Sequence, residues 1–261
     1  MNIGPLAPAG AGGAVLLEVR DLVKRFGGLQ ALDRLSFEVR AGEVLGIIGP
    51  NGAGKTALVN CITGFYACDG GTIRFRGEEI ARLPMHRIGR LGIARTFQNI
   101  RLFRRMSVLE NVVAAQREWV ARPLRSLLVR DPEVFRRPAL ELLERMRLAG
   151  RADQPAGTLA YGDARRLEIA RALAARPRLL FLDEPAAGMN EQETEALTGD
   201  IRLALELVDS VVVIEHDIEL IRALSNRIVA MDYGRKIAEG SAESVFADPR
   251  VVTAYLGTGG D

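Results

Sequence analysis

The sequence lacks the features of a secreted or membrane-spanning protein. Its two cysteines, Cys61 and Cys68, form neither a CxxC pair nor a repeated framework, so we expect free thiols in a reducing compartment. The N-terminus has no basic start followed by a continuous apolar stretch, as a signal peptide would. No apolar run approaches the roughly 18 residues that a membrane span needs. These absences predict a cytoplasmic protein, which would reach a membrane only through a partner.

An excess of charge of one sign is also missing. The chain has 35 Lys and Arg against 33 Asp and Glu, a net charge of +2, so its overall field argues neither for nor against nucleic acid as a partner. Over 261 residues, 48% are hydrophobic and 26% charged, which indicates a globular protein with one large or two modest domains. Between Arg101 and Arg151, 12 arginines face 6 acidic residues. This excess indicates a solvated face or, alternatively, a surface toward an anionic bilayer or acidic partner.

A glycine-rich stretch between two apolar segments carries the strongest signal for chemistry. It follows the run Val44 to Ile48 and precedes the apolar segment from Ala57, which predicts a strand, a turn and a helix. The glycines allow successive N–H groups to point inward, and the helix adds its positive end, so the turn can hold a polyphosphate. Lys55 would reach the outer phosphates and Thr56 a bridging magnesium ion. The loop is Gly49-Pro50-Asn51-Gly52-Ala53-Gly54-Lys55-Thr56.

Two further apolar runs predict buried parallel strands that end in polar residues. Residues 178–185 end in Asp183 and Glu184, and residues 211–214 are followed by Glu215-His216-Asp217. Ligands of open α/β sheets bind beyond the carboxyl ends of such strands. Alternating patterns predict half-buried antiparallel strands, and a terminal hairpin, at residues 17–19, 35–39, 72–77, 227–231 and 235–238.

Several helix starts are also visible. Ser107 and Glu110 form a capping box that opens a helix to about Ala121, and Asn190 with Glu193 opens one to about Leu207. Asp131-Pro132-Glu133 starts a further helix. Taken singly, four other residues have ordinary structural explanations. Gln98 would be solvated, Gly162 would start a helix, His216 would lie on the surface, and Phe26 would make a small core contact.

Together these features occur in the order typical of the ATP-binding subunits of ABC transporters, which the sequence resembles from Val15 to Leu256. The resemblance implies an α/β fold: a P-loop nucleotide-binding domain with a mainly parallel sheet, an antiparallel β layer and an inserted α-helical subdomain. The expected divisions are a mobile tail (1–14), a nucleotide-binding core in two parts (15–98 and 161–240), a helical subdomain (99–160) and C-terminal helices (241–261).

The resemblance also implies roles for single residues toward ATP and Mg²⁺. Phe26 would stack on adenine, Glu184 would polarise the attacking water, and His216 would contact the γ-phosphate. The signature loop, residues 159–163, would bind the nucleotide held by an opposite protomer, and residues 187–190 would cross the interface. The implied nucleotide-binding residues are Phe26, Gly49, Pro50, Asn51, Gly52, Ala53, Gly54, Lys55, Thr56, Ala57, Gln98, Ala160, Tyr161, Gly162 and Asp163. The implied metal ligands are Thr56, Gln98 and Asp183, and the implied catalytic residues are Lys55, Glu184 and His216.

Three positions depart from the family pattern. Ala57 replaces a second hydroxyl after Lys55, Ala160 replaces the usual Ser, and Asp163 stands where Gln is usual. An Asp in the first turn of a helix complements the helix dipole, but its charge would repel a partner's polyphosphate. We therefore expect Asp163 to weaken ATP-driven closure of the dimer.

Residues 93–103, 161–171 and 254–257 look like one branch of the family, the larger ATP-binding subunit of high-affinity branched-chain amino acid importers. This resemblance implies a peripheral ATPase at the cytoplasmic face of the inner membrane. Its partners would be polytopic permease subunits, a second ATP-binding subunit that is either different or a copy of itself, and, indirectly, a substrate-binding protein. No nucleic-acid partner is expected.

Two alternatives remain open at this point. A soluble ABC ATPase acting on nucleic acid or ribosomes usually carries a long coiled-coil insertion, zinc-binding cysteines or two cassettes. This sequence has no sustained heptads, no CxxC pair and one phosphate-binding loop. The second alternative is a nucleotide-binding regulator without hydrolysis, which the charge of Asp163 supports. It is disfavoured by the intact Lys55, Thr56, Asp183, Glu184 and His216.

Overall fold

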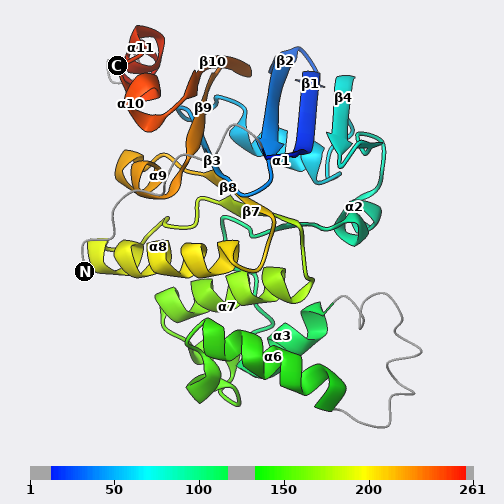
Figure 1. Ribbon diagram of the computed structural model, residues 1–261, viewed down its shortest axis with the longest axis vertical. Helices are drawn as coiled ribbons and strands as arrows, with labels where there is room; N and C mark the ends of the chain where they lie inside the picture. Colours follow the sequence, from blue (N-terminus) through cyan, green and yellow to red (C-terminus); the bar gives the residue numbers. More distant parts are fainter. Residues whose placement is uncertain (1–12, 117–132, 257–261) are drawn as a thin grey trace.

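Two β-sheets of different strand direction organise the chain. The computed structural model describes residues 13–116 and 133–256. The four-stranded sheet is antiparallel, in the order β2-β1-β4-β5, and the six-stranded sheet has the order β10-β9-β3-β8-β7-β6 and is parallel except for the β9–β10 pair (Figure 1). The strands are β1 (Val15–Phe26), β2 (Leu29–Arg40), β3 (Val44–Ile48), β4 (Gly70–Phe75), β5 (Glu78–Glu79), β6 (Ile93–Arg95), β7 (Leu179–Asp183), β8 (Ser210–Ile214), β9 (Arg227–Asp232) and β10 (Arg235–Gly240). The predicted α/β class, with a mainly parallel sheet and an antiparallel layer, is confirmed.

The central strand β3 is buried on both faces, as its uninterrupted apolar sequence predicts. Val44 and Ile48 belong to a core shared with the helices below the sheet. Leu45 and Ile47 face the opposite side, where α1 and the antiparallel sheet cover them. The parallel sheet therefore lies between two apolar layers. Polar groups can be placed where its strands end, beyond their C-terminal residues.

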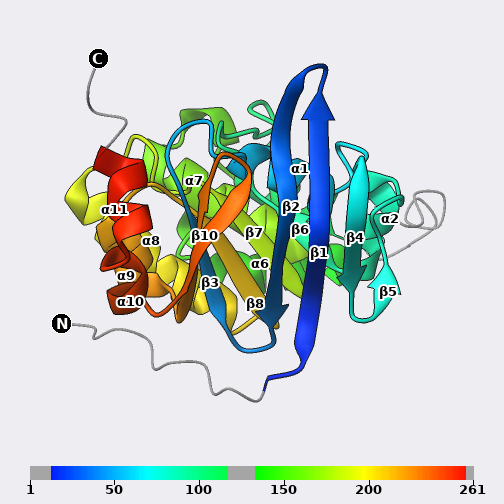
Figure 2. The same ribbon diagram turned by 90° about the horizontal axis from the view of Figure 1, so that it is seen from above.

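The helices divide between these two layers. Helix α1 lies between the sheets, whereas α7, α8, α3 and α6 stack below the parallel sheet (Figure 1). From above, β1, β2 and β4 run side by side, with α10 and α11 at the far side of the molecule (Figure 2). The helices are α1 (Lys55–Ile62), α2 (Met85–Leu91), α3 (Val108–Ala115), α6 (Glu133–Arg145), α7 (Tyr161–Ala174), α8 (Glu191–Leu205), α9 (Ile218–Leu224), α10 (Ala242–Phe246) and α11 (Pro249–Leu256), with 3₁₀ turns η1 (Ala149–Arg151) and η2 (Ala156–Thr158).

The helix that begins at Ser107 is shorter than predicted. Its capping box with Glu110 forms as expected, but α3 ends at Ala115 rather than near Ala121. Gln116 adopts an extended conformation, and its Nε2 donates a hydrogen bond to Phe135 O (2.7 Å) in α6. A tertiary contact thus stops the helix. Residues 117–132, which include the predicted helix start at Asp131-Pro132, lie outside the described residues.

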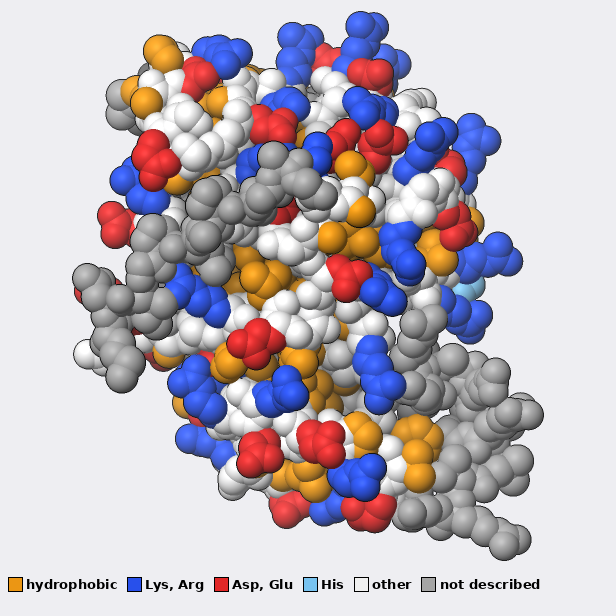
Figure 3. Space-filling model, in the orientation of Figure 1, with side chains coloured by type: hydrophobic (Ala, Val, Ile, Leu, Met, Phe, Trp, Pro, Cys, Tyr) orange, Lys and Arg blue, Asp and Glu red, His pale blue; other side chains and the backbone are white. Residues whose placement is uncertain are grey.

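Other boundaries bear on the expected divisions of the chain. Helices α3 and α6 lie within the predicted helical subdomain, 99–160, and the predicted terminal hairpin is β9–β10. Residues 1–12 of the predicted tail and residues 257–261 of the C-terminal part lie outside the described residues. Within the described ranges, no helix has both the length and the hydropathy to cross a membrane. On the face shown in Figure 3, basic and acidic side chains are interspersed, as the net charge of +2 suggests.

Candidate nucleotide-binding and hydrolytic site

The glycine-rich loop connects β3 to α1, as predicted. Gly54 has a φ of +96°, and a Cβ there would lie 2.4 Å from Ala31 O on β2. At Gly49 a Cβ would lie 2.3 Å from Met231 O on β9. Only glycine fits such close approaches. The loop is therefore fixed against the neighbouring strands, and its backbone N–H groups lie at the N-terminus of α1.

Lys55 places a buried amine at this loop. It is 7% exposed, and its Nζ donates hydrogen bonds to Gly49 O (2.5 Å) and Pro50 O (3.0 Å). Burial lowers the pKa of Lys55, while the charges of Glu184 and Asp183 oppose that shift. A cation held beside an anion-binding turn fits the predicted contact with phosphates.

Asp183, at the end of β7, is held by an arginine that the sequence analysis did not identify. Its Oδ2 lies 3.6 Å from Arg95 Nη2, and Arg95 Nη1 donates to Asn60 Oδ1 of α1 (2.6 Å). Burial raises the pKa of Asp183, and Arg95 opposes that rise. Arg95 therefore connects the predicted metal-binding carboxylate to the helix of the phosphate-binding loop. An arginine ending a short apolar strand was the signal available in the sequence.

Glu184 and Gln98 meet although 86 residues separate them in the sequence. Gln98 Nε2 donates a hydrogen bond to Glu184 Oε2 (2.6 Å). Glu184 also has a φ of +44°, an uncommon conformation for a residue with a side chain, and such strain is frequent at functional sites. The contact brings a predicted general base and a predicted metal ligand together.

The end of β8 contributes His216 and, unexpectedly, Glu215. The Glu215 side chain is almost completely buried and accepts hydrogen bonds from Ala186 N (2.9 Å) and His216 N (3.1 Å). Burial raises its pKa. His216 has a side chain that is 60% exposed, with Nδ1 3.6 Å from Glu215 Oε2. Glu215 thus ties the loop after β7 to the end of β8, and the carboxylate closing an apolar strand was its signal in the sequence.

Phe26 lies at the end of β1 with 42% of its surface exposed. Its ring meets Tyr66 edge to face with centroids 5.1 Å apart, and Tyr66 meets Phe65 in the same way at 5.2 Å. Lys24 Nζ lies 5.0 Å from the Phe26 centroid. The ring is thus partly exposed and is also contacted by Tyr66 and Lys24. Tyr66 and Phe65 were not predicted.

The signature loop begins α7, with Ala160 at the N-cap and Tyr161 in the first turn. Tyr161 Oη donates a hydrogen bond to Ala187 O (2.5 Å), in the loop that follows Glu184. The loop predicted to bind a partner's nucleotide is therefore connected to the hydrolytic edge of its own chain.

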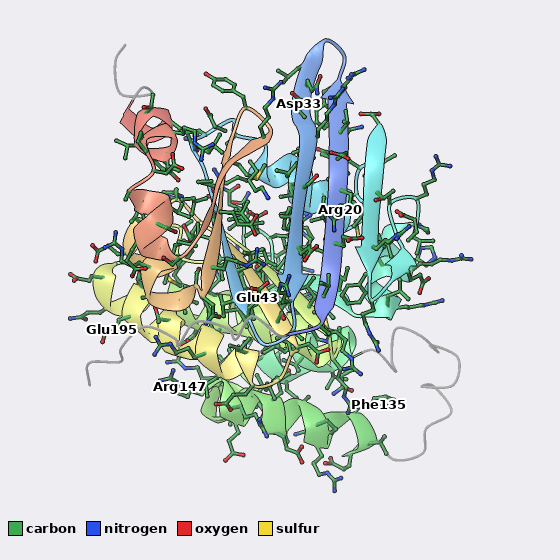
Figure 4. All side chains as sticks on the ribbon, turned by 45° about the horizontal axis from the view of Figure 1, so that its top comes forward. Arg20, Asp33, Glu43, Phe135, Arg147 and Glu195 are labelled. Atoms are coloured by element: carbon green, nitrogen blue, oxygen red, sulfur yellow. The ribbon has the colours of Figure 1, made fainter. Side chains whose placement is uncertain are left out.

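The Asp163 carboxylate has two partners that the sequence analysis did not identify. Its carboxylate pairs with Arg151 Nη1 at 2.9 Å and with Arg166 Nη1 at 2.8 Å, and its side chain is 11% exposed. Arg166 also binds Asp200 (2.7 Å), which Arg147 contacts in turn (2.5 Å; Figure 4 labels Arg147). The charge expected to repel a polyphosphate is thus compensated within the chain. The nucleotide contacts implied for residues 160–163 stay predictions.

The side chains at this edge fit a magnesium ion bound together with a polyphosphate. Thr56, Gln98 and Asp183 offer hydroxyl, amide and carboxylate oxygens, the hard ligands that Mg²⁺ prefers. Within residues 13–116 and 133–256, no group of three or more His, Cys, Asp or Glu forms a metal cluster. A site with so few protein ligands suits Mg²⁺, which usually keeps waters and substrate oxygens. The nucleotide and metal roles of these residues remain predictions.

Comparisons with known proteins agree with this geometry. Residues 32–187 match the ABC transporter family, and residues 235–261 match the family described as branched-chain amino acid ATP-binding cassette transporter. The high-affinity branched-chain amino acid transport ATP-binding protein BraF of Pseudomonas aeruginosa is 46% identical over 249 residues, which cover 93% of this chain and 98% of BraF. The protein of the same description from Escherichia coli K12, LivG, is 44% identical over 253 residues, 93% of this chain and 98% of LivG.

Solved structures give the same result. The ADP conformation of MJ1267, an ATP-binding cassette of an ABC transporter, has a TM-score of 0.83 and 32% identity, covering 94% of this chain and 99% of that one. A nucleotide-free ATP-binding cassette from an ABC transporter has a TM-score of 0.82, also with 32% identity, and covers 93% of this chain and 99% of that one. With its phosphate-binding loop, its carboxylate edge and these relatives, the chain belongs to the ABC transporter family as one of its ATP-binding cassettes.

Proposed function

We propose that this chain is the ATP-hydrolysing subunit that energises import of branched-chain amino acids through a membrane permease. It is an ATPase of the ABC family. The observation that carries the proposal is the convergence of Lys55, Gln98, Asp183 and Glu184 at one edge of the parallel sheet. The branched-chain substrate is inferred from the relatives BraF and LivG and from the match of residues 235–261.

The phosphate-binding loop would hold the substrate ATP. Its backbone N–H groups and the positive end of α1 bind the phosphates, and the Lys55 amine adds a charge close to them. Phe26, which is 42% exposed and meets Tyr66 edge to face, would stack on the adenine. Thr56, Gln98 and Asp183 would hold a Mg²⁺ ion, which would supply positive charge to offset that of the phosphate oxygens.

Glu184 would orient the attacking water and accept its proton. The hydrogen bond from Gln98 to Oε2 fixes the carboxylate, and a positioned general base contributes roughly 10²- to 10⁴-fold in rate. His216, exposed at the end of β8, contacts the γ-phosphate. Each site is completed by the signature loop of a second ATP-binding subunit, either a different one or a copy of this chain.

The proposed assembly places the chain on the cytoplasmic face of the inner membrane, bound to polytopic permeases that receive amino acids from a substrate-binding protein. A mild-detergent pull-down of the tagged chain from native membranes, followed by mass spectrometry, tests this. We expect two polytopic permeases and a smaller ATP-binding subunit at stoichiometric levels. Ribosomal or DNA-repair proteins without a membrane partner would overturn the transport function.

The enzymatic part is tested by Glu184→Gln. This change keeps the shape of the side chain but removes the base, so we expect ATP binding to persist while hydrolysis falls about 10²- to 10⁴-fold, together with cellular uptake of labelled leucine. Glu195→Gln, on the exposed side of α8 (Figure 4), is the matched control. Near wild-type hydrolysis in Glu184→Gln would show that Glu184 is not the general base.

A further inference from the structure

Helix α7 buries two opposite charges one turn apart. Arg165 is fully buried and Glu168 is 5% exposed. Arg165 Nη1 and Glu168 Oε2 lie 2.6 Å apart. The attraction within a buried ion pair often fails to offset the free-energy cost of removing both charges from water. Apolar residues of similar volume at the same positions often give equal or greater stability. Stability alone therefore does not explain why this ion pair is buried here.

The remaining hydrogen bonds of the pair go to the backbone around Gln98. Phe97 N donates to Glu168 Oε1 (3.3 Å), and Arg165 donates from Nη1 to Phe97 O (3.0 Å) and from Nη2 to Gln98 O (3.1 Å). Strand β6 ends at Arg95, and Thr96 still binds β7: Thr96 N donates to Phe181 O (2.9 Å), and Thr96 Oγ1 accepts from Asp183 N (3.4 Å). Beyond Thr96 the chain leaves the sheet, and side chains of α7 replace the strand as its hydrogen-bond partner.

This attachment extends along the same segment. Arg171, further along α7, donates to Arg101 O and lies over the Phe103 ring, with Cζ 4.8 Å from its centroid. Residues 97–103 are thus held by one face of α7. At the N-terminal end of that helix Tyr161 contacts the loop after Glu184, and at the held segment Gln98 contacts Glu184 itself.

We propose that Arg165 and Glu168 are positioning residues, which fix Gln98 against Glu184 and thereby link the orientation of the signature helix to the hydrolytic edge of the same chain. The inference deepens the proposed function and rests on it. The two side chains act through the Phe97 and Gln98 backbone and touch no reacting atom. Loosening them lets Gln98 shift while the phosphate-binding loop, which follows the inner strand β3, keeps its contacts with β2 and β9.

Enzyme kinetics with two single variants and one double variant separate positioning from stability. Arg165→Met and Glu168→Leu each leave one buried charge unpaired, so both should lower Tm. The double variant removes both charges and should recover most of that Tm. Because misplacement of a site by about 1 Å can cost roughly 100-fold, we expect kcat to fall about 10- to 100-fold in all three variants. KM for ATP should change little, because the loop is untouched.

The matched control is an exposed pair on α6. Arg137 and Glu141 lie 3.7 Å apart with side chains 82% and 67% exposed, and Arg137→Met with Glu141→Leu should leave kcat and Tm unchanged. Glu168→Gln keeps an oxygen that accepts from Phe97 N, so it should retain more activity than Glu168→Leu. Recovery of kcat together with Tm in the Arg165→Met, Glu168→Leu double variant would overturn the proposal.

Hydrogen exchange gives a readout that does not depend on turnover. The Phe97 amide should be protected in the wild type and exchange faster in the double variant, whereas amides of α1 should not change. Unchanged exchange across residues 97–103 would overturn the proposal even if kcat fell. A wild-type chain that fails to hydrolyse ATP with its partner subunits would contradict the proposed function instead, and the exchange result would still decide whether the pair holds the segment.

Discussion

The position of the Asp163 carboxylate decides what this residue does to the site. From the sequence alone, a negative charge in the signature loop predicts repulsion of a partner's nucleotide. In the structure the carboxylate turns to Arg151 and Arg166. In this chain Asp163 therefore forms ion pairs within α7, to Arg166, and between α7 and η1, to Arg151.

Replacing Asp163 should consequently affect stability more than rate. Asp163→Gln removes the charge that pairs with Arg151, whose side chain is 46% exposed, so we expect a loss of about 1 kcal/mol, or about 2–4 °C in Tm. The ATPase rate should not rise. Thermal melts and rates of Asp163→Gln beside the exposed control Asp153→Gln check this, and a faster variant would restore the repulsion hypothesis.

At the level of elements, the loop after β7 is held from two sides. Tyr161 of α7 binds Ala187 O, and Glu215 at the end of β8 binds Ala186 N. These contacts join the start of the signature helix, the loop that follows Glu184 and the end of β8. Tyr161 and Glu215, two residues of the same chain, thus restrain the loop that leads to the predicted dimer interface.

The hydroxyl of Tyr161 can be tested alone. Tyr161→Phe removes a hydrogen bond worth about 0.5–1.5 kcal/mol, so we expect a kcat about 2- to 10-fold lower if that free energy holds the loop during hydrolysis. Tyr233→Phe is the matched control, because Tyr233 is 81% exposed in the turn between β9 and β10. Equal rates in the two variants would show that the loop keeps its position without the hydroxyl.

Glu215 predicts a pH dependence of stability. Burial raises the folded pKa of Glu215, against the hydrogen bonds donated by Ala186 N and His216 N. The charge of Lys55 also interacts with that of Glu215. A raised folded pKa means that the contribution of this group to stability is complete below the unfolded pKa, about 4.3. That contribution is lost as the pH rises through the folded pKa.

The neutral variant Glu215→Gln should therefore gain on the wild type as the pH rises. In melts with a chelator present, we expect the Tm difference, variant minus wild type, to be more positive at about pH 7 than at about pH 4. Glu195→Gln serves as the exposed control. A difference that is constant or falls over this range would contradict the raised pKa of Glu215.

At the scale of the whole molecule, the two loops expected to bind one nucleotide belong to different layers. The phosphate-binding loop packs against β2 and β9, whereas the signature loop starts α7, which packs with α3 and α8 below the parallel sheet (Figure 1). Under the proposed function, a second chain would complete such a site, with its signature loop facing the phosphate-binding loop of the first chain.

Specific activity should therefore depend on protein concentration. When a mixture of this chain and its partner subunit is diluted, we expect ATP hydrolysis per chain to fall. Light scattering should report dissociation over the same concentrations to single chains, and the mass of this chain is 28.4 kDa. Mass action requires this when the active species is an assembly. Specific activity that stays constant while the measured mass is that of single chains would show that one chain suffices.

Local sequence patterns predicted much of the fold. The apolar run of β3 followed by the glycine spacing gave the strand, loop and α1 because each of these depends on neighbours in the sequence. The capping boxes at Ser107 and Asn190 both form. The end of α3 was wrong by several residues, because the contact between Gln116 and Phe135 decides it.

The sequence by itself determined the order of motifs, the buried strands and the residue types at their carboxyl ends, since apolar periodicity and glycine spacing act over a few residues. Only the tertiary structure decided which charges are compensated. Arg95 reaches Asp183, Arg151 reaches Asp163, and Arg165 with Glu168 holds the segment of Gln98. The free energy of a charged group depends on its burial and on its partners, and these partners come from parts of the chain that meet only when it folds.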